Sequence, residues 1–181
     1  TARTTVLTSD FEKRFQSRLR ALAAAHDLLV KSSYEVADLE ELIRSQLGSV
    51  EYLAGSRITL QGPPVKARPE AAQNLAMAFH ELVANAELHG ALSNGGGNVS
   101  VVWRVEEAED GEKLWIEWRE SGGPPPAADA RRGFGTSLIL NNLPRSLEGD
   151  VTLAHETGGT ICHMSLPMRR IRPEIAASKY A

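Results

Sequence analysis

The sequence predicts an α+β domain at about residues 49–170, preceded by a helical segment at about residues 1–48 and followed by a tail at 171–181. Two observations support this fold class. The first 48 residues show only the spacing of apolar residues that is typical of helices. The residues that follow contain one long helical stretch and several short stretches with strand-like alternation, a mixture typical of α+β domains.

Within the helical segment, Ser9 and Glu12 form a capping box, which predicts a helix from there to about residue 29. Its apolar seam has a 4-3-4-3 spacing and consists of Phe15, Leu19, Leu22, His26 and Leu29. A single helix cannot bury such a seam alone, so we expect a partner helix. A shorter helix is predicted at 38–47, with Gly48 as its end.

The elements predicted after residue 48 are a strand at 57–60, a helix at 69–89, strands at 99–105 and 113–119, a helix at 136–142, and strands at 149–155 and 160–167. Pro69 suits the first turn of the long helix. Pro144 is expected to end the 136–142 helix early. We expect a poorly ordered tail after Arg169, with a short helix at 174–179 as one option.

Composition excludes several classes of protein. A net charge of −3 without a basic stripe argues against a nucleic-acid binder. Cys162 is the only cysteine, so we expect no disulfide and no structural zinc, which fits a cytoplasmic protein. No apolar run approaches the roughly 20 residues that span a bilayer, and residues 1–5 do not resemble a signal peptide. Because the first residue is not Met, we expect a fragment of a longer protein.

A polar stripe runs along the long helix, where Glu81, Asn85 and His89 recur every four residues beside an apolar arc. Asn is a poor helix former, so its place inside the helix needs a reason. Its side-chain oxygen suits Mg²⁺, which prefers oxygen ligands. A solvent-facing flank of the helix explains the stripe equally well.

Glu120 stands at the end of a predicted strand and is followed closely by Gly122 and Gly123. Glycines let a ligand approach the backbone, and a carboxylate there accepts a hydrogen bond from an exocyclic amine such as that of adenine. A surface Glu before a turn is the simpler explanation of this motif taken alone.

A glycine-rich stretch opens the next predicted helix, and its polar and glycine residues are Arg131, Arg132, Gly133, Gly135, Thr136 and Ser137. Backbone N–H groups at a helix N-terminus suit phosphate, and the arginines add positive charge. The stretch is not a Walker loop, because no Gly-Lys-Ser/Thr follows. A simple helix-entry turn is the alternative.

Together, in this order, these motifs resemble the catalytic domain of HWE-type histidine kinases, within the GHKL class of ATP-binding folds, over His80–Pro167. His80 matches the histidine of the N-box, and Trp118-Arg119-Glu120 matches the Trp-x-Glu of the next box. Glu120-Ser121-Gly122 stands where other histidine kinases have Asp-x-Gly. The stretch 133–136 resembles the glycine box, and Gly158-Gly159-Thr160 resembles the late Thr near adenine.

The N-terminal residues resemble the second helix of the family's dimerisation and phosphoacceptor hairpin, with residues 1–8 as the hairpin loop. The first helix, which carries the phosphoacceptor His, would then lie upstream of Thr1. His26 is interpreted as a packed structural histidine rather than the phosphoacceptor. His155 and His163 are expected at the surface of the last strands. Trp103, Trp115 and Trp118 are expected in the core or on a sheet face.

The resemblance implies a two-layer α/β sandwich with a mixed, mostly antiparallel sheet, and a sensor histidine kinase that uses ATP and Mg²⁺. Glu81, beside His80, would be the general base, Asn85 would hold Mg²⁺, and residues 121–132 would form a mobile lid. The nucleotide-binding residues would be Asn85, His89, Glu120, Gly122, Gly123, Arg131, Arg132, Gly133, Gly135, Thr136, Ser137 and Thr160. A response-regulator receiver domain would accept the phosphoryl group, and the helical segment would form a homodimer.

One position departs from the family pattern, because Leu88 stands where a Lys is expected. A positive contact to phosphate is then missing or comes from Arg131 or Arg132. This departure keeps a second interpretation open, a kinase-like scaffold without ATP turnover. A GHKL enzyme of another reaction type is a third interpretation, which the match to the hairpin disfavours.

Overall fold

The computed structural model describes residues 2–125 and 134–173. Its main sheet contains β2 (Ile58–Gln61), β4 (Asn98–Glu106), β5 (Lys113–Ser121), β6 (Asp150–Glu156) and β7 (Gly159–Pro167), in the order β2-β4-β5-β7-β6. The β2 strand is parallel to β4, and the other neighbours are antiparallel. The sheet is therefore mixed and mostly antiparallel, as the sequence predicted.

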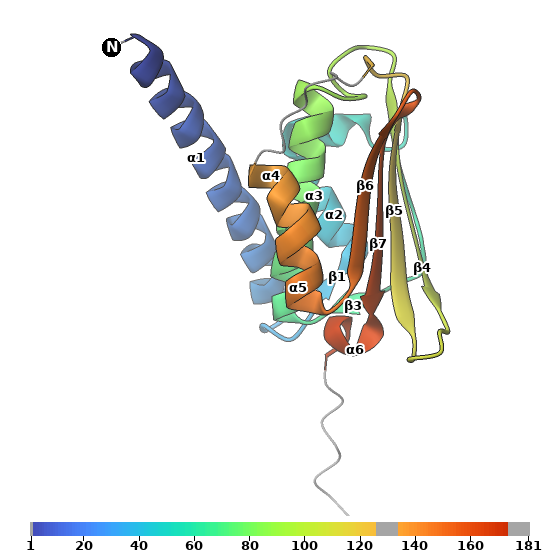
Figure 1. Cartoon of the computed structure of the whole chain (residues 1–181). Coiled ribbons are helices and arrows are strands. Elements are labelled where there is room, and N and C mark those ends of the chain that lie inside the picture. The colour runs from blue at the N-terminus through green and yellow to red at the C-terminus, as the bar shows by residue number, and fades with distance from the viewer. Residues whose placement is uncertain (1, 126–133, 174–181) are drawn as a thin grey trace, which may run out of the picture.

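Helices cover one face of this sheet (Figure 1): α2 (Leu39–Leu47), α3 (Pro69–Leu88), α4 (Phe134–Ser137) and α5 (Leu143–Leu147), the last two joined by a π-helical turn at Leu138–Asn142. The long helix α1 (Ala2–Lys31) packs against α3 and α2 on the side away from the sheet. The architecture is thus a two-layer sandwich with α1 added outside the helical layer.

The core lies between the sheet and α3. Because strand side chains alternate, β5 turns Leu114, Ile116 and Trp118 inward, and all three are fully buried. They belong to the same apolar cluster as Leu75 and Phe79 of α3. The outer face of the sheet carries a different set of side chains, with the Arg104 guanidinium 3.4 Å from the centre of the Trp115 ring. The predicted places of the tryptophans are confirmed.

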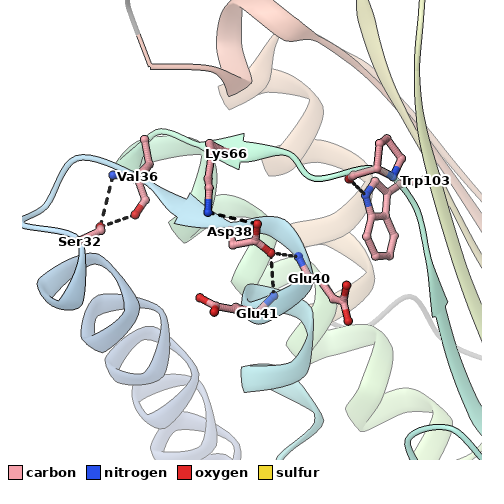
Figure 2. Close-up of polar contacts among 8 residues, drawn as sticks. Ser32, Val36, Asp38, Glu40, Glu41, Lys66 and Trp103 are labelled. Atoms are coloured by element: carbon pink, nitrogen blue, oxygen red, sulfur yellow. Dashed lines mark hydrogen bonds and ion pairs between the residues drawn. The ribbon is translucent and has the colours of Figure 1, made fainter.

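A small two-stranded sheet of β1 (Ala37–Asp38) and β3 (Lys66–Ala67) fixes the start of α2. Figure 2 shows that the Asp38 carboxylate accepts hydrogen bonds from the backbone N–H groups of Glu40 and Glu41, at 3.0 and 3.3 Å, and pairs with Lys66 at 3.3 Å. This is an ordinary N-cap, strengthened by an ion pair. Nearby, the Trp103 indole N–H donates to the Pro63 carbonyl at 2.8 Å.

The first helix is longer than predicted. It begins at Ala2, so the hairpin loop expected at residues 1–8 is wrong for residues 2–8. The first 31 residues contain neither Gly nor Pro, and nothing in the chain therefore forces a break before Ser9. A capping signal marks a place where a helix is able to start, but it does not stop a helix that has begun earlier.

Most of the predicted seam of α1 is exposed. Phe15, Leu19 and Leu22 are 52%, 50% and 38% exposed, whereas Leu29, the last seam residue, is buried together with Ala21 and Ala25. The two alanines lie outside the seam, and their small side chains let α1 approach the domain there. His26 is also exposed and is hydrogen-bonded to the Tyr34 hydroxyl at 2.9 Å, so its assignment as a packed histidine is wrong. A partner helix for the seam stays a prediction.

Pro144 does not end the helix that contains it, which contradicts the prediction. A proline ring clashes with the carbonyl four residues earlier in an α-helix. Here the wider π-helical turn lies directly before α5, with the Leu143 N–H bonded to the Leu138 carbonyl five residues back, and the chain continues to Leu147.

The expected disorder after Arg169 is also wrong for the described residues. A turn of helix, α6 (Met168–Ile171), buries Ile171, whose carbonyl accepts a 2.8 Å hydrogen bond from the Arg68 N–H. The optional helix at 174–179 lies outside the described residues. Within the part of the chain that is described, no helix is both long and apolar enough to cross a membrane.

Candidate functional site

A cavity of about 490 Å³ opens where the end of α3 meets the end of β5. Six of the predicted site residues line it: Asn85, His89, Glu120, Gly123, Thr136 and Thr160. They come from α3, from β5 and the loop after it, from α4 and from β7. The structure therefore brings parts of all three predicted motifs, and the late Thr, to one cavity.

Glu120 is the buried acid of this cavity, with 4% of its surface exposed. Its carboxylate accepts hydrogen bonds from the Ala91 N–H at 2.8 Å and from the Trp118 indole N–H at 3.1 Å. Burial raises the pKa of Glu120, and these two hydrogen bonds act in the opposite direction. A carboxylate has about four acceptor positions, so the acid keeps acceptor capacity for a ligand.

Close packing around Glu120 explains why positions 90 and 123 are occupied by glycine. A Cβ on Gly90 would overlap the Glu120 carboxylate and lie 2.9 Å from the Ala86 Cα. A Cβ on Gly123 would lie 2.8 Å from the Ala91 Cα and N. Only a residue without a side chain fits at either position, because real Cβ contacts are longer. The end of α3 and the loop after β5 are thus held together by backbone contact.

Asn85 lies one turn before the end of α3 and lines the cavity. The described residues make no hydrogen bond to its side-chain amide, while its backbone carbonyl accepts the N–H groups of His89 and Gly90. Leu88 lines the cavity as well and is 61% exposed. No Lys or Arg occurs among the described residues of the lining, and Arg131 and Arg132 lie outside the described part of the chain.

His80 and Glu81 are not among the residues that line the cavity; they contact α1. The His80 Nε2 is hydrogen-bonded to the Ser17 hydroxyl at 3.1 Å, and the Glu81 carboxylate pairs with the Arg18 guanidinium at 2.5 Å. Burial lowers the pKa of His80, with the charge of Glu81 opposing this. In this structure Glu81 is therefore neutralised by a cation on α1.

The glycine box packs against the same acid. Gly135 is buried, and a Cβ there would overlap the Glu81 carboxylate. Ser137 is exposed and hydrogen-bonded to Asn141 at 2.9 Å, outside the lining. Gly122 also lies outside the lining, and Gly133 falls outside the described residues. Of the expected lid, residues 121–125 are described, and Pro124 and Pro125 line the cavity.

Sequence reasoning missed two polar residues of the lining, Ser93 and His155, and it had placed His155 at the strand surface. The more informative of the two is His155. It is exposed and faces the cavity beside Thr160, its partner in the β6–β7 register. The signal was available, because the short turn at residues 157–158 pairs these two positions whenever the hairpin is tight.

Solved structures share this fold. The histidine kinase domain of the blue-light activated histidine kinase EL346 from Erythrobacter litoralis matches with a TM-score of 0.62 at 18% identity, over 86% of this chain and 75% of that one. The catalytic domain of the histidine kinase ThkA matches with a TM-score of 0.55 at 17% identity, over 77% of this chain and 99% of that one. The fold is therefore the GHKL type found in the catalytic domains of histidine kinases.

Sequence comparisons identify the family. Residues 1–64 match the family model of the HWE histidine kinases. The blue-light-activated histidine kinase of Brucella ovis is 31% identical over 175 residues, which are 97% of this chain and 35% of that protein. The protein of the same name from Rhizobium johnstonii is 35% identical over 152 residues, which are 84% of this chain and 43% of that protein. The chain belongs to the HWE histidine kinase family and spans less than half the length of these relatives.

Proposed function

We propose that this chain is the ATP-binding catalytic part of a sensor histidine kinase. It transfers the γ-phosphoryl group of Mg-ATP to a histidine on the partner helix of the helical segment, and a response-regulator receiver domain takes the group onward. The observation that supports this proposal most directly is the shared cavity of Asn85 and Glu120. A helical amide and a strand-end carboxylate there match the metal and purine positions that the resemblance implies.

The lining fits a bound Mg-nucleotide chemically. Asn85 offers a side-chain amide that the described residues leave without a hydrogen bond, and an amide oxygen is a suitable Mg²⁺ ligand. When bound, the metal would neutralise charge on the phosphates. Glu120 and Thr160 would hold the purine at the other wall. Thr136 and the arginines at 131 and 132 would contact the phosphates.

The transfer step requires a rearrangement at Glu81. The Arg18 guanidinium occupies the Glu81 carboxylate, and Glu81 is not among the residues that line the cavity. In our proposal the Arg18–Glu81 pair opens when the acceptor helix is engaged, and Glu81 then orients or deprotonates the acceptor imidazole. Burial lowers the pKa of His80 beside it, which favours the neutral imidazole.

Two observations favour an alternative, a kinase-like scaffold without ATP turnover. Leu88 lines the cavity where the family pattern has a Lys, and Glu81 is engaged by Arg18. Phosphoryl transfer to an acceptor helix supplied as a separate chain distinguishes the two functions. Labelled acceptor histidine supports the kinase, and ATP binding without any label supports the scaffold.

Calorimetric titration with Mg-ATP tests the proposed site. We expect wild type to bind and Asn85→Ala to lose at least about tenfold in affinity, because the metal loses a ligand. Asn74→Ala is the matched control: it removes an Asn from the same helix whose amide bonds to the Glu70 carbonyl, outside the lining. Equal affinity in wild type and Asn85→Ala contradicts the metal assignment.

The chain itself is expected to bind ATP without becoming labelled. An acid-labile phosphoryl group on His26 after incubation with labelled ATP would contradict this expectation, since it would make an exposed residue of α1 the acceptor.

A further inference from the structure

His155 lines the cavity and lies near the end of β6. It is paired in register with Thr160 of β7, and both side chains line the cavity. The imidazole Nδ1 lies 3.1 Å from the Thr160 hydroxyl oxygen, which is hydrogen-bonding distance. The two residues therefore act as one polar unit on this wall.

This unit lies close to Glu120. Gly159, next to Thr160, has a φ of +139° and lines the cavity, and a Cβ there would overlap the Glu120 carbonyl oxygen. Burial raises the pKa of Glu120, and its hydrogen bonds from Ala91 and Trp118 act in the opposite direction. The turn of the hairpin thus holds His155 and Thr160 against the strand end that carries the buried acid.

The direction of the Thr160 hydroxyl proton decides what the hydroxyl offers a ligand. A hydroxyl has one proton to donate and two lone pairs. If the proton points to His155 Nδ1, the Thr160 oxygen is only an acceptor toward the cavity. The 6-amino group of adenine donates, whereas a 6-oxo group, as in hypoxanthine, accepts. Two acceptors in the lining of the same cavity, Glu120 and Thr160, then favour the amino purine over the oxo purine.

We propose that His155 is a positioning residue for nucleotide selection: in the tautomer protonated at Nε2, its Nδ1 accepts the Thr160 hydroxyl proton and makes Thr160 an acceptor for the 6-amino group of adenine. The inference rests on the proposed function, because it requires a purine beside Glu120. It adds a residue of the β6 strand to the set that distinguishes one purine nucleotide from another.

The test compares the affinities of Mg-ATP and Mg-ITP, two nucleotides that differ at position 6 of the purine, by calorimetric titration. We expect wild type to favour ATP. In His155→Ala the freed hydroxyl also donates, so we expect the ATP-to-ITP affinity ratio to fall about three- to tenfold, the effect of one hydrogen bond. His155→Asn places a side-chain carbonyl near the position of Nδ1, and we expect it to restore most of the ratio.

Two further variants separate selection from folding. Thr160→Val keeps the shape of the side chain but removes the hydroxyl, and its effect on the ratio is expected not to add to that of His155→Ala. His163→Ala is the matched control, because His163 lies on the outer face of the sheet and pairs with Glu117 at 2.8 Å. We expect this variant to keep the wild-type ratio.

The outcomes are distinct. An unchanged ratio in His155→Ala, or an equal loss of ATP and ITP that Asn does not rescue, overturns the role of His155 while leaving ATP binding intact as a function. Additive effects of the two substitutions on the ratio overturn the hydrogen-bonded unit. If wild type binds neither nucleotide, the proposed function fails and this inference fails with it.

Discussion

The last three turns of α3 present two different environments to the residues of the predicted N-box. Toward the cavity, the side-chain amide of Asn85 has no hydrogen bond from any described residue. Toward α1, His80 and Glu81 are occupied by Ser17 and Arg18. These residues are close in sequence and lie on one helix. Asn85 nevertheless lines a cavity, whereas His80 and Glu81 contact the neighbouring helix α1.

Under the proposed function, this difference assigns nucleotide binding and phosphoryl transfer to separate faces of α3. The environment of Asn85 depends on the close contact between the end of β5 and the loop after α3. The other side depends on where α1 lies. A perturbation of α1 should therefore change the second environment and leave the first unaffected, and the predictions below test this separation.

The largest effect is expected from Gly90→Ala, which acts on the cavity side. The new Cβ would overlap the Glu120 carboxylate and press on the Ala86 backbone. We expect a loss of about 1–3 kcal/mol in the free energy of unfolding and a clear loss of ATP affinity. Urea titration and calorimetry measure the two effects. Gly95→Ala is the control, since a Cβ there meets open space; a similar loss in both variants would contradict the steric explanation.

A similar loss of stability, but no loss of ATP affinity, is expected from Arg18→Met, which acts on the α1 side. The variant keeps most of the length of the side chain but leaves the buried Glu81 carboxylate without this cation. We expect the free energy of unfolding to fall by about 1–3 kcal/mol. ATP affinity should stay at the wild-type value, because Arg18 does not line the cavity. A large drop in affinity would show that the two sides are coupled.

Gly135→Ala probes the glycine box on the same side. The added Cβ would overlap the carboxylate end of Glu81, which is able to shift because it belongs to a side chain. We expect a loss of about 1 kcal/mol in the free energy of unfolding, at the low end for overpacking. Combined with Arg18→Met, the effect should be less than additive, because Glu81 is then freer to move. Strictly additive losses of stability would show that Gly135 and the Arg18–Glu81 ion pair contribute independently.

The smallest effect concerns pH. Burial lowers the pKa of His80 below its ordinary value of 6.5, so near that pH the unfolded chain binds more protons than the folded one. The contribution to stability is therefore fully present at pH values above 6.5 and is lost as the pH falls from 6.5 through the lower pKa of the folded state. His80→Gln should weaken the acid dependence of the free energy of unfolding. An identical pH profile in both proteins would contradict this assignment.

Much of the fold was predictable because its signals are local. The capping Asp38, Pro69 at the start of α3, and alternation in β4 and β5 each fix an element through neighbouring residues. Contact between distant segments was not predictable in the same way. The periodicity of α1 identified apolar residues on two faces of the helix, and it did not show which face packs against the domain. The face with Ala21 and Ala25 packs against the domain, and the face with Phe15 is exposed.

The candidate site shows the same limit. Glu120 and Asn85 were predicted from residue type and position, and one cavity unites them. The pairing of Glu81 with Arg18 spans 63 residues of sequence and depends on how α1 docks. His155 was interpreted as a surface residue because strand alternation does not show that a hairpin end borders a cavity.

The hydrogen bond between the Arg68 N–H and the Ile171 carbonyl has a practical consequence. This hydrogen bond joins the end of α6 to the residue before α3. Here the last residue of β7 pairs with the first residue of β5, whereas Glu120 lies at the other end of β5. Figure 1 shows α6 at that remote end. A fluorophore attached just after Ile171 therefore lies far from the cavity, which makes this position a suitable attachment site for binding measurements.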